Sequence, residues 1–292
     1  MAISTKTLGD ITPEVWRNVV LSGLRKDLVG ELICNKNFKQ EMWGKGDTLN
    51  ITSMGALTDN QYTDANITYE ALTDSKTQLV IDQEQYVAFK DEDAERNNIS
   101  VNYMTEVMTD MGYQLGDFWD NQIMAEYANA GLDSYATGTT DWQLTAGTAA
   151  NLPALMGAIK RQLKVAKAPA GATYFIAPPE IEEAITLYFG SKGPASQYSD
   201  EYAKNANYAG KFFGVEVFCS NNCVTETSTT HGLAGVMGTS IALANDIITD
   251  EALRLEGRIA NGYRAISIGG TKTYRPAISV NVNLNEVVIA TS

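Results

Sequence analysis

Histidine and cysteine, which build many catalytic and metal sites, are scarce in this sequence. The 292 residues include one histidine, His231, and three cysteines. Three cysteines build neither a zinc finger nor a paired disulfide framework, and one thiol stays unpaired in any case, which is typical of a reducing compartment. No apolar run approaches the ~18 residues of a membrane span, and no secretory signal is visible. We therefore expect synthesis in a cytoplasm and no membrane partner.

The sequence also lacks the common catalytic motifs. His231 lies in the stretch STTHG, which is typical of a surface loop, and the nearest approach to a nucleophile elbow, GTSIA at 238–242, has alanine where the second glycine belongs. No phosphate-binding glycine loop is present. Cys219 and Cys223 have no neighbouring histidine, which disfavours zinc. We expect no catalytic residues, no cofactor and no metal.

Basic residues are rare in one third of the chain. Residues 47–150 hold 3 basic and 18 acidic side chains, a balance of −15, whereas 1–46 have a balance of +2 and 151–292 a balance of zero. The formal net charge of the whole chain is −13. Such acidity disfavours a protein that grips nucleic acid by its phosphates, and the simplest interpretation is a well-solvated surface.

Two N-terminal segments have too little apolar sequence nearby to bury their own faces. Thr12-Pro13-Glu14 is a helix start, and Val19 and Leu24 belong to the apolar face that follows it. Residues 47–82 alternate polar and apolar residues on either side of a polar tip, which predicts a long hairpin. An isolated hairpin is marginal in water. Both segments therefore pack on something distant in the chain or on another chain.

The longest apolar periodicity predicts one helix over 91–129. Val101, Met104, Met108 and Leu115 follow helical steps, and a methionine stripe of this kind is usually core. Acidic residues at 91–95 suit a helix N-terminus. The helix would be more than roughly 50 Å long, which exceeds the diameter of most compact domains of this size.

The second half of the chain mixes helices with short strands. An amphipathic helix is predicted from Leu152 to Leu163, strands at 174–177, 212–218 and 234–237, and further strands through the tail to 284. Together with the hairpin and the long helix, this order indicates an α+β fold.

This order of elements resembles the major capsid proteins of tailed bacteriophages, which have the HK97-like fold. The run TLNITSMGALTDNQYTDANITYEALTDSKTQLVIDQEQYVAFKDED is similar to that family's E-loop and to its entry into the spine helix. YAGKFFGVEVFCSNN (208–222) is similar to a strand turn common there, and EALRLEGRIANGYRAISIGGTKTYRPAISV (251–280) resembles the returning P-domain strands. The resemblance implies an N-terminal arm (1–46), an E-loop hairpin (47–82), a P domain (83–149) with the spine helix, an A domain (150–249) and C-terminal strands that return to the P domain (250–292).

The resemblance implies a function as well. Copies of the chain would form pentamers and hexamers of an icosahedral shell around double-stranded DNA, with a portal at one vertex and the virion as location. The arm begins almost at Met1, so we expect a separate scaffolding protein. The hairpin tip, Gly55 to Asn66, contains no lysine, which disfavours the covalent cross-link of some relatives.

Two other functions remain open at this point. An encapsulin-type compartment shell would have the same fold but enclose a protein cargo. A cytoplasmic acyl- or phospho-transfer enzyme with an unrecognised site belongs to a different class, and the scarcity of histidine and of phosphate-loop glycines argues against it.

The charge distribution suggests which surfaces meet in a shell. Residues 252–276 hold five basic side chains against Glu256 alone, a local balance of +4, while the hairpin is acidic. We expect the hairpin of one subunit to steer onto this basic surface or the arm of the next. The residues that we expect at the subunit interface are Val19, Leu24, Asp59, Tyr62, Asp64, Arg254, Arg258 and Arg264.

Overall fold

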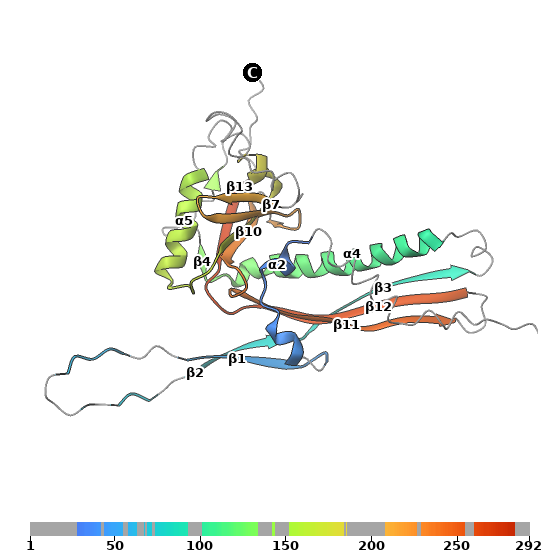
Figure 1. Cartoon of the computed structure of the whole chain (residues 1–292), viewed down its shortest axis with the longest axis horizontal. Helices are drawn as coiled ribbons and strands as arrows, with labels where there is room; N and C mark the ends of the chain where they lie inside the picture. The colour runs from blue at the N-terminus through green and yellow to red at the C-terminus, as the bar shows by residue number, and fades with distance from the viewer. Residues whose placement is uncertain are drawn as a thin grey trace, which may run out of the picture.

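The computed structural model describes residues 28–41, 44–54, 58–62, 67, 69–71, 74–92, 101–133, 142–143, 152–183, 185, 208–226, 229–254 and 260–283. They form two layered regions with a hairpin that projects from their junction (Figure 1). One region is built on an eight-stranded sheet and the other on three long strands beneath a helix.

The eight-stranded sheet collects strands from distant parts of the chain. Its main path runs in the order β4 (Leu132–Asp133), β13 (Ile278–Asn283), β10 (Thr229–Val236), β6 (Thr173–Ala177), β8 (Val215–Cys219) and β7 (Tyr208–Phe212). Two short strands lie off this path, with β5 (Trp142–Gln143) pairing β13 and β9 (Val224–Glu226) pairing β10. The β6–β8 pair is parallel, so the sheet is mixed.

Helix α5 (Leu152–Val165) covers one face of this sheet. Leu152, Leu155, Ile159 and Leu163 are all buried in one apolar cluster with strands β6, β8, β10 and β13. Their spacing of three and four residues places them on one side of a helix, so the sequence prediction for this segment is confirmed. The strand predicted over 212–218 is instead two strands, because a tight turn separates β7 from β8.

Helix α4 (Val101–Ala125), with the 3-10 turn η3 (Glu126–Asn129), covers the other face of the sheet and also the second region. Its C-terminal half buries Trp119 and Ile123 against β6 and β10. Its middle buries Met108 and Met111 against the three long strands, so these methionines are core. One helix therefore contributes to two apolar clusters.

The predicted start of this helix at residue 91 is wrong. Asp91 and Glu92 belong to strand β3 (Gln83–Glu92), and residues 93–100 lie outside the described part of the chain. In β3 the half-buried Val87 and Phe89 alternate with exposed neighbours, and the strand pairs with β12 over ten residues. Pairing with a distant strand overrides the local helical pattern, so the two acids cannot cap a helix there.

Three long antiparallel strands form the second sheet, in the order β11 (Ile241–Arg254), β12 (Ala260–Thr273) and β3. This changes two predicted boundaries. The proposed A-domain end at 249 falls within β11, and β13, which was expected beside the P domain, pairs with β10 in the eight-stranded sheet. A four-residue turn separates β10 from β11, and alternating strands look alike in sequence whichever sheet they join.

Strands β1 (Thr48–Met54) and β2 (Asp74–Val80) form the hairpin that the sequence predicted over 47–82. Its base packs on the long sheet, with Leu49, Leu79 and Ile81 buried against Ala242 and Ile268. Beyond that base the hairpin extends away from the rest of the molecule (Figure 1).

A glycine of β12 lets the hairpin base approach the sheet closely. A Cβ atom at Gly270 would overlap the backbone carbonyl oxygen of Val80, and backbone cannot rotate away as the end of a side chain can. Both backbone polar groups of Ile81 are hydrogen-bonded to the start of the hairpin. Its N–H donates to the carbonyl of Asp47 at 2.9 Å, and its carbonyl accepts the N–H of Gly46 at 2.7 Å.

We expect Gly270→Ala to lower the free energy of unfolding by about 1–3 kcal/mol, because the added methyl group displaces the strand that lies on it. Urea denaturation of the unassembled subunit measures the change, and limited proteolysis reports whether the hairpin base has loosened. Gly131→Ala is the matched control, since a Cβ at Gly131 meets nothing within 4 Å. Equal stability of the two variants would contradict the expectation.

Candidate functional site

The hairpin tip exposes large aromatic side chains, which are usually at least partly buried in proteins. Tyr62 is 67% exposed and Tyr69 is 89% exposed, and Asp59 is exposed beside them. The N–H of Thr58 donates to Glu70 at 3.0 Å across the hairpin, and this hydrogen bond lowers the pKa of Glu70. Asp64, a further predicted interface residue, lies outside the described residues. The described residues of the tip therefore present aromatic and acidic side chains that belong to none of the apolar clusters.

The predicted basic surface is only partly described. Arg264 is exposed on β12 opposite Ala88 of β3, while Arg254 ends β11 and its side chain is not described. Arg258 lies outside the described residues. The hairpin and the outer ends of the long strands point in opposite directions (Figure 1), so one chain does not bring the acidic tip to this surface.

Val19 and Leu24, the predicted interface residues of the arm, also lie outside the described residues. The end of the arm is described and packs on its own chain. Val29 and Ile33 are buried against Trp119 and Ile123 of α4, where the short helix α2 (Gly30–Ile33) lies. This part of the arm therefore belongs to the subunit core.

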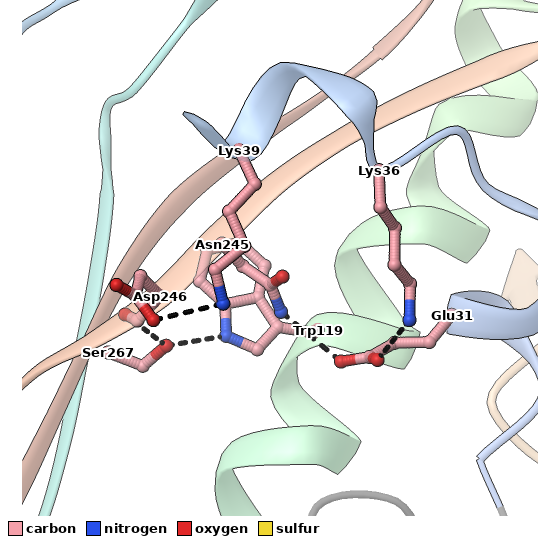
Figure 2. Close-up of polar contacts among 7 residues, drawn as sticks. All are labelled: Glu31, Lys36, Lys39, Trp119, Asn245, Asp246 and Ser267. Atoms are coloured by element: carbon pink, nitrogen blue, oxygen red, sulfur yellow. Dashed lines mark hydrogen bonds and ion pairs between the residues drawn. The ribbon is translucent and has the colours of Figure 1, made fainter. Parts of the chain in front are cut away.

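Polar contacts fasten the arm to the long strands (Figure 2). Glu31 accepts a hydrogen bond from the Asn245 side chain at 3.2 Å and pairs with Lys36 at 2.6 Å. Lys39 lies 3.0 Å from the carboxylate of Asp246 in β11. Both ion pairs are partly exposed, so each contributes about 0–1 kcal/mol to the stability of the subunit. Their main effect is to fix where the arm lies.

Below these pairs, Trp119 joins α4 to the long sheet. Its indole N–H donates to the hydroxyl of Ser267 at 2.9 Å, and that hydroxyl donates to the backbone carbonyl of Asp246 at 3.2 Å (Figure 2). Trp119 and Ser267 are both buried, and this hydrogen bond gives the only polar atom of the indole ring a partner inside the protein. The sequence gives no local signal for this pair, because 148 residues separate them.

A buried carboxylate joins three parts of the chain. Asp120 on α4 accepts hydrogen bonds from the N–H of Gly30 at 2.6 Å, the hydroxyl of Ser220 at 3.0 Å and the amide of Asn222 at 3.0 Å. Burial raises the pKa of Asp120, and the three donors oppose that shift. The carboxylate ties the arm and the end of β8 to the helix. Sequence analysis did not single it out, because its partners lie about 90 and 100 residues away.

His231 is not in a surface loop, contrary to the sequence expectation. It lies in β10, stacks on Tyr127 at 4.1 Å between ring centroids, and its Nδ1 is 2.8 Å from the side-chain oxygen of Asn281. The hydroxyl of Tyr127 donates to Glu226 at 2.6 Å, which raises the pKa of Tyr127 to about 12. No serine, threonine or cysteine nucleophile is hydrogen-bonded to His231 in the described part of the chain.

The three cysteines are buried free thiols. Burial is the main cause that raises the pKa of Cys34, Cys219 and Cys223, which keeps them protonated and poorly nucleophilic. Among the described residues, no three His, Cys, Asp or Glu side chains are grouped so as to hold a metal ion. None of the described helices has the length and apolar character needed to cross a bilayer.

A cavity of about 330 Å³ lies where the hairpin base meets the end of α4 and β12. Its walls are polar and include Gln78, Gln83, Gln122, Glu126 and Lys272. Glu126 is already engaged, since it accepts the backbone N–H of Thr273 at 2.7 Å. Polar walls of this kind favour bound water. The described lining contains no histidine or cysteine.

A family model described as phage capsid protein matches residues 74–265 of the chain. This span includes the returning hairpin strand, α4, α5 and most of both sheets. A search of curated protein sequences found no match.

Solved structures of similar proteins extend the comparison to almost the whole chain. A chain of Mycobacterium phage Che8 is 22% identical with a TM-score of 0.68, and the match covers 88% of this chain and 92% of that one. The capsid of Cyanophage P-SCSP1u matches at 15% identity and a TM-score of 0.63, over 97% and 92%. A virus-like particle from Pyrococcus furiosus matches at 14% and 0.53, over 91% and 98%. Identities this low show a shared fold alone.

The raised pKa of Asp120 predicts how subunit stability depends on pH. Because the folded pKa lies above the unfolded value near 3.8, the folded state binds more protons between the two values, and stability falls as the pH rises through that window. Relative to Asp120→Asn, the wild-type free energy of unfolding should therefore decrease from pH 4 upward in urea titrations of unassembled subunits. If the wild-type free energy of unfolding instead rose with pH relative to that of Asp120→Asn, the prediction would be wrong. Asp110→Asn, at an exposed position of α4, controls for the lost charge.

Proposed function

Because the chain belongs to the phage capsid protein family, we propose that its copies assemble into pentamers and hexamers that tile an icosahedral shell around double-stranded DNA. Its role as a major capsid protein with the HK97-like fold rests on the family match over residues 74–265, and the whole-chain likeness to phage capsid structures agrees with it. Self-assembly into a shell and a place in the virion follow from that role.

The shape of the subunit supports assembly through the hairpin. The tip exposes Tyr62, Ile67 and Tyr69 in the segment that joins strands β1 and β2. Such a hairpin is marginal alone, and its aromatic side chains lose water only when another surface meets them. A neighbouring subunit is the surface that a shell supplies.

We further propose that the acidic tip of one subunit steers onto the basic ends of the long strands in the next. Asp59 and Tyr62 would contribute from the tip, with Asp64 beside them, and Arg254, Arg258 and Arg264 from the strands. The opposite directions of hairpin and strand ends in one chain support contact between copies. Val19 and Leu24 of the arm complete the proposed interface.

The compartment-shell alternative is not favoured, because the family model that matches is that of a phage capsid protein. We also propose that the chain has no catalytic activity. The described cysteines are buried, and the histidine is packed between a tyrosine ring and an asparagine, which supports a structural protein.

Family resemblance supports the remaining partners in the proposal. A separate scaffolding protein would guide assembly, and a portal would occupy one vertex. The DNA would be enclosed without sequence-specific contacts, since the net charge of −13 disfavours phosphate binding. Assembly would take place in the cytoplasm of a bacterial host.

Negative-stain microscopy of the expressed full-length chain, with its co-encoded scaffold, tests the proposed function. We expect closed shells or rings of five and six subunits. We also expect particles purified from phage-producing cells to show the ultraviolet absorbance of nucleic acid together with protein. A monomer in light scattering at every concentration, with scaffold present, would contradict assembly. Particles that contain a folded enzyme and no nucleic acid would instead favour the compartment shell.

Charge reversal tests the proposed interface. We expect Arg254→Glu with Arg258→Glu to slow assembly at least about tenfold at low salt, because electrostatic attraction acts mainly on the association rate. Added salt should slow the wild type for the same reason and leave the variant little changed. Light scattering records the rate. The double variant Arg161→Glu with Lys164→Glu, at exposed positions of α5, is the matched control for the change in charge. Assembly that ignores both salt and the reversal would rule out steering by this surface.

A further inference from the structure

The turn between β7 and β8 presents an exposed aromatic ring on strained backbone. Phe212 and Val215 are paired, so the turn consists of Phe213 and Gly214 alone. Both have positive φ, 50° and 77°, as the type I′ hairpin turn requires. Glycine accepts this conformation freely, and asparagine or aspartate tolerates it, but phenylalanine is disfavoured there.

The Phe213 side chain is only half-buried in the subunit, so its own burial offsets little of that strain. Phe213 is 50% exposed, whereas Phe212 before it packs against the core under α5. Single exposed apolar residues are common and need no explanation, so exposure alone would carry no weight. Exposure together with a disfavoured φ is different, because the position would be better filled by asparagine on local grounds.

A hydrogen bond from α5 also supports the backbone of this turn. The ammonium group of Lys160 on α5 donates a hydrogen bond to the carbonyl oxygen of Phe213. Gly214 leaves room for that lysine, since a Cβ atom there would collide with the ammonium group. This contact supports the backbone that carries the ring within the subunit itself, before any partner binds.

We infer that Phe213 is an anchor residue for a second copy of this chain, buried against the neighbouring subunit when copies assemble. The inference rests on the proposed shell function. The turn lies at the end of β7, the last strand on the described path of the eight-stranded sheet, so it stands at the margin of that region. In a shell built from one chain, the margin of a subunit faces another copy. Buried aromatic anchors commonly carry a large share of interface energy.

The substitution Phe213→Asn separates folding from assembly, because Asn-Gly is the favoured sequence for this turn. We expect the Tm of unassembled subunits to rise by roughly 2–4 °C as strain is removed. We expect the concentration of full-length chain needed for assembly, from sedimentation velocity over a dilution series, to rise at least about tenfold. Phe213→Gly should weaken assembly in the same way, without relying on an asparagine side chain.

Lys167 supplies a matched control, because it is the other described non-glycine residue with positive φ, at 54°, and it follows the end of α5. Lys167→Asn should raise the Tm similarly and leave assembly unchanged. If the wild type assembles and both Phe213 variants assemble equally well, this inference fails while the proposed function stands. A lower Tm in both Phe213 variants would also overturn it, since the ring would then belong to the subunit core. A wild type that never assembles would overturn the proposed function itself.

Discussion

The burial of helix α4 between two sheets is the constraint on which the rest of this subunit depends. Its C-terminal half lies in the cluster beneath the eight-stranded sheet, and its middle lies on the three long strands. Trp119 stands where the two meet, fully buried, with its one polar atom bonded to Ser267. The next residue, Asp120, holds the arm and the end of β8. Because α4 packs against both sheets, a shift of either sheet together with the helix would break the contacts between the helix and the other sheet.

This arrangement leaves the hairpin outside the core. Its base is held by Leu49, Leu79 and Ile81 and by the close approach at Gly270, but its tip has exposed aromatic side chains. A rigid body with a projecting, poorly covered element is suited to tiling, because the free energy that the tip lacks becomes available only when a neighbour covers it. In the proposed interface, the acidity of the same segment would serve orientation more than affinity, since exposed charge pairs contribute little to stability.

Several titratable groups are buried or partly buried in the described part of the subunit. Cys34, Cys219 and Cys223 are desolvated thiols, and His231 is stacked on Tyr127. Asp120 keeps its carboxylate in a buried place because three donors surround it. A buried polar group that is hydrogen-bonded as Asp120 is helps to specify one arrangement of the chain, which suits a subunit present in many copies.

Local pattern in the sequence determined a good part of this structure. The α+β class, helix α5, the body of helix α4, the hairpin over 47–82 and the family resemblance all follow from periodicity and element order, because each depends on residues close together in the chain. Only the tertiary structure decided the rest. Residues 91 and 92 lie in strand β3 and not in the predicted helix, because they pair with β12. Strand β13 pairs with β10 and not with the long sheet. The environment of His231, the carboxylate junction at Asp120 and the strained backbone at Phe213 depend on contacts between residues up to about 100 positions apart or on backbone angles, and neither is visible in a linear pattern.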